Sequence, residues 1–169
     1  MMKKSIVFLS LFCVLMVGFW SVSAAPANFA GAWSLDKSKS EGLQGRMANV
    51  DQTWVVTQDA KTFTIEKSFS GGEQPIPSQK STYNLDGSET SMEMTGRMPG
   101  KAALKAKWQS DGKILELNSV LKTNVQGNDV TINTTEHWEL ADGGKTLKVH
   151  RVSESPQGTR ETKLTFARK

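Results

Sequence analysis

The chain has 169 residues, a formal net charge of +4 and a single cysteine, Cys13. This length suits one domain with a hydrophobic core of its own. One cysteine excludes an internal disulfide framework and a cysteine-based metal site, and the modest charge does not indicate a nucleic-acid-binding protein.

Residues 1–24 have the pattern of a cleavable export signal. Lys3 and Lys4 form a short positive region, a mostly apolar run follows them, and small residues lead up to Ala24. The apolar run is shorter than the roughly 20 residues of a membrane-spanning helix. We therefore expect cleavage after Ala24, no membrane insertion of the processed chain, and one periplasmic or secreted domain over residues 25–169.

Cleavage would also change the charge and the cysteine count. It would leave 145 residues with no cysteine, which removes thiolate catalysis, and 19 Lys and Arg against 17 Asp and Glu, a formal charge of +2. The basic row of Lys101, Lys105 and Lys107 is then best interpreted as the solvated face of a strand. We expect no nucleic-acid partner.

Short stretches of alternating apolar and polar residues follow one another along the mature chain. The clearest puts Ala102, Leu104, Ala106 and Trp108 on one face and lysines on the other, the period of a half-buried strand. Counting such stretches predicts strands at residues 32–35, 52–58, 62–69, 79–85, 89–95, 101–108, 114–121, 129–140, 146–153 and 159–167.

The residues between these stretches favour tight hairpin turns. Asp-Gly pairs at 86–87, 111–112 and 142–143 supply the positive φ values that such turns need. Neighbouring strands are therefore expected to be antiparallel. Eight to ten such strands with one apolar face must close or stack, because an open sheet leaves its edges exposed. We predict an all-β, antiparallel up-and-down barrel.

Residues 36–51 break the strand pattern. Leu43, Met47 and Val50 lie at helical spacing within this segment. We expect a short helix or an irregular segment after the first strand.

The hairpin around residues 142–145 allows its register to be predicted. Placing apolar faces together sets Trp138 opposite Val149, and a slip of one residue would turn every side chain over. Glu136 then faces Arg151 on the core side. A carboxylate and a guanidinium directed inward are costly to desolvate unless they pair.

Two interpretations of this pair stay open. Arg151 suits bidentate binding of a carboxylate, so the pair can be a polar spot where Arg151 meets a ligand's acidic group or stacks on Trp33. The alternative is an internal ion pair with Glu136 that fixes the register and closes one end of the barrel.

The same register places His137 opposite His150 on the outer face. Imidazole nitrogens are good zinc or copper ligands, but two ligands make a poor site and the sequence has only two histidines. We predict no metal site and interpret the pair as exposed cross-strand neighbours.

The start of the mature domain, with Gly31-Ala32-Trp33, resembles the opening motif of the calycin superfamily, the lipocalins and fatty-acid-binding proteins. The chain is also similar to small secreted lipocalin-like proteins of bacteria in its meander of hairpins. The resemblance implies a glycine that lets the first strand bend, a tryptophan that closes one barrel end, and a small ligand held inside.

Two positions of the family pattern have to be compared with this chain: the ligand anchor on the last strand and the arginine over the first-strand tryptophan. Fatty-acid-binding proteins hold a carboxylate with an Arg-x-Tyr pair on the last strand, whereas this chain ends in Phe-Ala-Arg-Lys and its one tyrosine is Tyr83. Lipocalins place a late arginine over the first-strand tryptophan, for which Arg151, Arg160 and Arg168 are candidates. The predicted register favours Arg151.

The aromatic residues are numerous for a domain of this size. They pack well on pleated surfaces, and in a barrel of about eight strands some can line a cavity for one small molecule. Met92, Met94 and Met98 fit either an entrance loop or a second core patch. The predicted ligand site comprises Trp33, Trp54, Tyr83, Trp108, Glu136, Trp138 and Arg151.

No catalytic motif is evident. The chain lacks a Gly-x-Ser-x-Gly elbow, a His-Glu-x-x-His pair and a phosphate-binding glycine loop. We predict no catalytic residue and no cofactor. The expected function is export followed by binding of a small apolar or amphipathic molecule inside the barrel. The alternative is a filled barrel that acts through its surface as an envelope interaction module or inhibitor.

Overall fold

The computed structural model describes residues 25–72, 75–95, 98–125 and 127–169, so the predicted export signal lies outside them. Ten strands make up almost all of the regular structure: β1 (Gly31–Leu35), β2 (Asp51–Gln58), β3 (Thr62–Ser70), β4 (Gln79–Asn84), β5 (Thr90–Met94), β6 (Gly100–Gln109), β7 (Ile114–Val125), β8 (Asn128–Ala141), β9 (Thr146–Ser155) and β10 (Gly158–Arg168). The helical elements are short: η1 (Lys37–Lys39), α1 (Arg46–Asn49), η2 (Ser110–Gly112) and η3 (Asp142–Gly144). Within the described ranges, none of them has the length and apolar character that crossing a bilayer requires.

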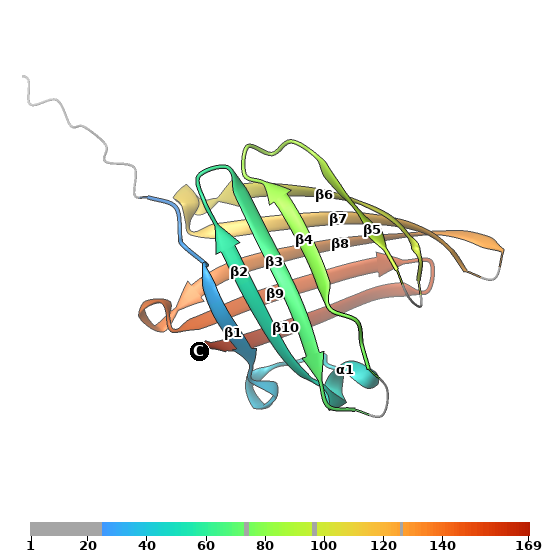
Figure 1. Ribbon diagram of the computed structural model, residues 1–169, viewed down its shortest axis with the longest axis horizontal. Helices are drawn as coiled ribbons and strands as arrows, with labels where there is room; N and C mark the ends of the chain where they lie inside the picture. The colour runs from blue at the N-terminus through green and yellow to red at the C-terminus, as the bar shows by residue number, and fades with distance from the viewer. Residues whose placement is uncertain (1–24, 73–74, 96–97, 126) are drawn as a thin grey trace, which may run out of the picture.

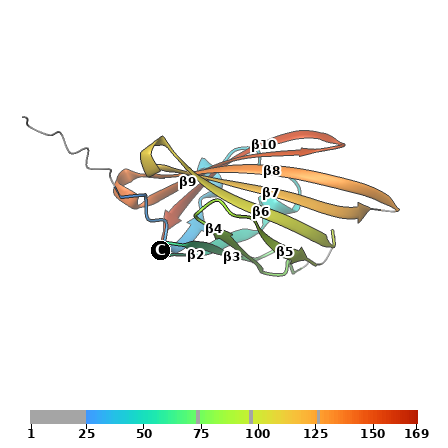
Figure 2. The ribbon, with the colours of Figure 1, turned by 90° about the horizontal axis from the view of Figure 1, so that it is seen from above.

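The strands form one antiparallel sheet that curls into a nearly closed barrel (Figure 1). Their order is β4-β3-β2-β1-β10-β9-β8-β7-β6-β5, so β1 joins the two halves of the chain. Figure 2 shows β2, β3 and β4 on one side of the molecule and β7, β8 and β10 on the other. The two edge strands meet where the Thr90 hydroxyl on β5 donates to the Thr82 carbonyl on β4 at 2.6 Å. The predicted all-β up-and-down barrel is confirmed.

The register of the β8–β9 hairpin is the one that the apolar pattern predicts. Trp138 is the partner of Val149, and Glu136 is the partner of Arg151. Trp138 and Val149 are both buried, which is the physical reason for this register.

The segment between β1 and β2 contains only one turn of α-helix. Gly42 and Gly45 adopt φ values of +74° and +54°, which break a right-handed helix before Arg46. Gly42 also touches another strand, because a Cβ atom there would lie 2.4 Å from the carbonyl oxygen of Glu161. After α1, Val50 is buried in the core while Met47 is exposed.

Trp33 lies near the end of the barrel that carries the β8–β9 turn, since the arginine over its ring also donates to the carbonyl of Gly144 in that turn. Its ring is fully buried, and its Nε1 donates to the carbonyl of Phe29 at 2.9 Å. The cation over this ring is Arg168, whose Cζ lies 4.3 Å from the ring centroid. The expectation that Arg151 would take this place is wrong. Arg168 takes it because β10 pairs directly with β1 and makes Arg168 the partner of Trp33.

Gly31 is required by this same contact. Arg168 Nη1 donates to the carbonyl of Ala30 at 2.7 Å. A Cβ atom on Gly31 would lie 2.5 Å from Nη1, and the residue has a φ of +140°. The glycine of the opening motif therefore leaves space for the arginine and adopts a backbone conformation that other residues rarely take.

Aromatic rings fill the barrel next to this end. Trp138 is at the centre of the cluster, with ring centroids 5.2 Å from Trp54, 5.3 Å from Phe63 and 6.1 Å from Phe29. These rings are all nearly or fully buried. This part of the barrel is therefore a packed core.

Replacing Gly31 with alanine tests the role of the motif glycine. G31A should lower the free energy of unfolding in urea by about 2 to 3 kcal/mol, because it adds backbone strain and displaces the guanidinium of Arg168. Gly158, with a φ of +120° and open space around its Cβ position, provides the control. G158A should lose only about 1 kcal/mol. Equal losses in the two variants would contradict the contact.

Candidate functional site

A cavity of about 370 Å³ lies inside the barrel beyond the aromatic cluster. Its size is in the range of pockets that take small molecules. The wall combines apolar side chains with polar ones: Met92, Met94, Leu104, Leu121, Ile132, Leu164, Gln52, Lys67, Glu136, Arg151 and Thr162. The barrel is therefore filled at the Trp33 end and hollow in this part.

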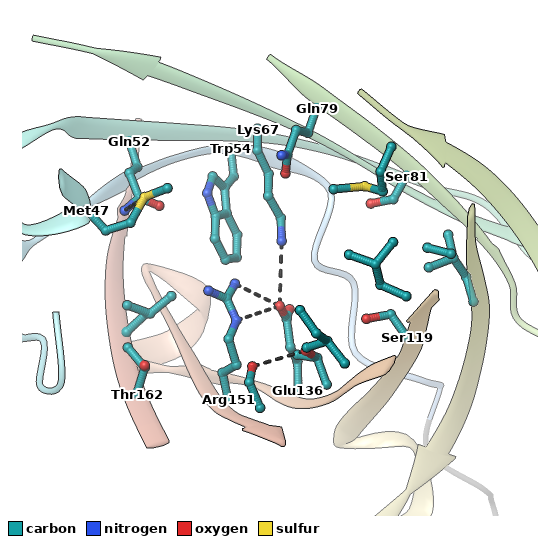
Figure 3. A pocket seen from close by; sticks show the side chains of 18 of the residues that line it. Met47, Gln52, Trp54, Lys67, Gln79, Ser81, Ser119, Glu136, Arg151 and Thr162 are labelled. Carbon is teal, nitrogen blue, oxygen red and sulfur yellow. Dashed lines mark hydrogen bonds and ion pairs between the residues drawn. The ribbon is translucent and has the colours of Figure 1, made fainter. Parts of the chain in front are cut away.

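Glu136 on β8 is the centre of the polar wall (Figure 3). It is 7% exposed, and its Oε2 accepts a 2.8 Å hydrogen bond from Trp138 Nε1. Its Oε1 accepts a hydrogen bond from Arg151 Nε at 2.8 Å, and Arg151 Nη2 lies 2.7 Å from the same oxygen in an ion pair. Lys67 Nζ on β3 lies 3.6 Å from the same oxygen. Strands from opposite sides of the barrel thus bring two cations to one carboxylate.

The pKa values of these groups follow from burial and charge. Burial alone would raise the pKa of Glu136, but the positive charges of Arg151 and Lys67 outweigh it and lower this pKa to about 2. Burial lowers the pKa of Lys67 to about 8, against the attraction of Glu136 and with the repulsion of Arg151. At neutral pH the three groups therefore carry a net charge of +1.

Trp54 on β2 covers this ion cluster. Lys67 Nζ lies 4.4 Å from the centroid of its ring, and Arg151 Cζ lies 5.8 Å from it. Both distances are within the range in which an aromatic face attracts a cation. The ring thus stabilises positive charge in the cavity wall without neutralising it.

Tyr83 on β4 adds an uncharged polar group to the wall. Its side chain is buried, and burial raises the pKa of the phenol, an effect to which the negative charge of Glu136 adds. The hydroxyl therefore stays protonated at physiological pH and can act as a hydrogen-bond donor or acceptor.

The residues predicted from the sequence as a ligand site divide into two groups. Those that line the cavity are Trp54, Tyr83, Glu136 and Arg151. Those that do not line it are Trp33, Trp108 and Trp138. The second group lies in or beside the aromatic cluster, where Trp138 contributes indirectly because it fixes one oxygen of Glu136.

Sequence reasoning missed three polar residues of the cavity wall. Lys67 interrupts the inward-facing series that starts at Phe63 and Ile65, and this break in the alternation was the signal for an internal cation. Gln52 and Thr162 also line the cavity. The same alternation was the signal for them, because Gln52 shares the face of Trp54 on β2 and Thr162 shares the face of Leu164 on β10.

The two histidines lie side by side on the outside of the barrel. Their ring centroids are 6.3 Å apart. His137 Nε2 lies 3.2 Å from a Glu116 oxygen, and His150 Nε2 lies 2.8 Å from a Glu161 oxygen. Each imidazole thus contacts a carboxylate of a neighbouring strand. Among the residues that the structure describes, no group of three or more His, Cys, Asp or Glu side chains could hold a metal ion.

Comparison with known proteins identifies the fold. No protein-family model matches the chain, and no curated protein matches it in sequence. The crystal structure of zebrafish ileal bile acid-binding protein complexed with cholic acid is similar, with a TM-score of 0.55 and 15% sequence identity. The similarity covers 83% of this chain and 98% of the zebrafish protein. The chain thus has an antiparallel barrel whose fold resembles that of this bile acid-binding protein.

Replacing Glu136 with glutamine tests the energetics of the ion cluster. E136Q should lower the free energy of unfolding at pH 7 by about 3 to 5 kcal/mol, because it leaves Lys67 and Arg151 buried without their counter-charge. The exposed Glu154 on β9 provides the control, and E154Q should change this energy little.

The same variant tests the pH dependence. The pKa of Glu136 falls from 4.5 to about 2 on folding. Between these values the unfolded chain binds more protons, so stability is present above about pH 4.5 and is lost as the pH falls toward 2. Urea denaturation at several pH values should show this loss in the wild type and a smaller one in E136Q. Identical profiles would contradict the assignment.

Proposed function

We propose that the chain is an exported protein that binds a small amphipathic molecule with an acidic group inside its barrel. The observation that carries the proposal is the contact of two cations, Lys67 and Arg151, with the single carboxylate of Glu136 in the cavity wall. A buried surplus of charge is costly unless a counter-charge accompanies it. A ligand carboxylate or sulfonate would supply that charge.

Arg151 is the best placed group to receive the acid. Only its Nε and Nη2 interact with Glu136 in the structure, and its fork geometry suits a second carboxylate. Lys67 lies on the other side of the same Glu136 oxygen and adds a second positive charge. An anionic group bound between them would complete an alternating arrangement of two cations and two anions.

The rest of the cavity wall suits the apolar part of such a ligand. Met92 and Met94 on β5 lie beside Leu104 on β6 and Leu121 on β7, so three consecutive strands give this part of the cavity an apolar wall. Methionine side chains are flexible and adapt to ligands of irregular shape. The wall therefore favours an aliphatic body of variable outline over one rigid planar ring system.

The comparison supports the same class of ligand. The zebrafish protein that shares this fold is complexed with cholic acid, a small amphipathic acid. A filled barrel that acts only through its surface, the alternative function, does not account for a 370 Å³ cavity with charged side chains in its wall.

Replacing Arg151 with methionine tests the acid-binding role. R151M should bind dodecanoic acid about ten-fold more weakly and its uncharged methyl ester as well as the wild type does, because a charged hydrogen bond is lost only for the acid. Tryptophan fluorescence titration measures both affinities. Lys148 lies on the same strand and is exposed, so K148M is the matched control. Unchanged acid binding in R151M, with altered stability, would leave only a structural role for the pair.

Export is tested by locating the protein after expression in a bacterium. We expect the periplasmic fraction to contain a chain that begins at Ala25, as determined by N-terminal sequencing. Replacing Ala24 with phenylalanine removes the small residue before the cut and should leave the leader uncleaved. An uncleaved wild-type chain in the cytoplasm would contradict the proposal.

A further inference from the structure

The indole nitrogen of Trp54 lacks a hydrogen-bond partner. Among the side chains that the structure describes, it is the one buried nitrogen or oxygen atom without a hydrogen-bond partner. Trp54 is 1% exposed and lines the cavity. Because a buried N–H group without an acceptor destabilises the folded state, native proteins nearly always provide a partner. This donor therefore points to an acceptor that the chain itself does not supply.

The donor faces a different part of the cavity from the ion cluster. Figure 3 shows the nitrogen of Trp54 on the side of Gln52 and Met47, with Lys67 on the other side of the ring. Gln52 lies two residues before Trp54 on β2, and Thr162 lies on β10. Both are buried polar residues that line the cavity. Gln52 and Trp54 share the inward face of β2, and Thr162 is the strand partner of Arg151, next to the ion cluster. We call these three uncharged polar side chains, Gln52, Trp54 and Thr162, the polar wall.

A weak contact covers this wall. Gln52 Nε2 lies 3.9 Å from Met47 Sδ, and a thioether sulfur is a poor acceptor. Met47 is exposed and belongs to the single turn of α1. Movement of one flexible side chain would therefore free the Gln52 amide beside Trp54, and a ligand oxygen would replace the sulfur as a better partner for Gln52.

We propose that Gln52, Trp54 and Thr162 form a second polar subsite that binds an uncharged oxygen of the ligand, a hydroxyl or a carbonyl. The inference rests on the proposed function, in which the acid meets Arg151. The indole can only donate, whereas the amide and the hydroxyl can donate or accept. A ligand hydroxyl would accept a hydrogen bond from Trp54 and donate one to Gln52 or Thr162. The indole donor and one of these acceptors would then each have a partner.

The position of this subsite also restricts the ligand. Arg151 Cζ lies 5.8 Å from the centroid of the Trp54 ring, so the acid and the second oxygen bind close together. The ligand class is therefore an aliphatic acid with a hydroxyl or keto group a few bonds from its carboxylate. A simple fatty acid would leave the Trp54 donor unsatisfied.

Four probes of equal chain length test the inference: dodecanoic acid and its 3-hydroxy, 5-hydroxy and 12-hydroxy derivatives. The wild type should bind the 3-hydroxy or the 5-hydroxy acid about ten-fold more tightly than the 12-hydroxy acid, which has the same composition with its hydroxyl far from the carboxylate. W54F, which lacks the donor, should abolish this ratio. Because the readout is a ratio, a general weakening of binding in the variant cancels.

A second variant and a spectroscopic measurement do not depend on the folding of W54F. T162V removes the hydroxyl with little change in volume and should reduce the same ratio. In the wild type, the favoured hydroxy acid should move the indole N–H proton resonance of Trp54 downfield, and dodecanoic acid should not. Equal affinities for all three hydroxy acids, or a ratio that persists in W54F, would overturn the subsite. Failure of dodecanoic acid and every derivative to bind would instead overturn the proposed function and the subsite with it.

Discussion

The interior of this barrel depends on one buried carboxylate. Glu136 takes hydrogen bonds from Trp138 and Arg151 and lies 3.6 Å from Lys67, so it connects β8 to β9 on one side and to β3 on the other. Removing it would leave two cations without a counter-charge in a poorly hydrated space. Loss of one partner of a buried ion cluster destabilises a protein more than replacement of the whole cluster by apolar side chains. The same geometry leaves one positive charge unmatched. The contacts that stabilise the interior are therefore also those on which the proposed binding of an acid depends.

Trp54 separates the two halves of the barrel. Its ring centroid lies 4.2 Å from that of Phe166 and 5.2 Å from that of Trp138 in the packed half, and its face lies near the two cations of the hollow half. The indole thus packs as a core residue on one side while its nitrogen stays without a partner. Aromatic packing determines where the core ends, and the polar wall begins at the same side chain.

The sequence predicted the barrel and part of the site. Strict alternation and Asp-Gly turns were enough to predict antiparallel hairpins, and matching of apolar faces gave the Glu136–Arg151 pair, because a two-stranded register depends only on local residues. The contact between Arg168 and Trp33 was assigned to the wrong arginine, since it depends on closure of β10 against β1, which lie far apart in the chain. The alternation of β3 places Lys67 on the inward face, but its contact with Glu136 was missed for the same reason. Its partner Glu136 lies across the barrel, and no local pattern reveals which inward charges will meet.

Similarity of fold does not carry the site with it. Fatty-acid-binding proteins, which this chain resembles, hold a carboxylate with an Arg-x-Tyr pair on the last strand. This chain has Phe166-Ala167-Arg168 there instead. Arg168 lies over Trp33 and donates to the carbonyls of Ala30 and Gly144, so it closes the end of the barrel and does not line the cavity. The positive charges of the cavity come instead from β3 and β9. Because the cations lie on β3 and β9, a bound acid would lie beside Trp54 and Glu136. A ligand for this cavity would therefore need a different shape from one whose acid is held on the last strand. The barrel thus fixes the kind of space that is available, while the inward-facing charges determine the chemistry of its wall.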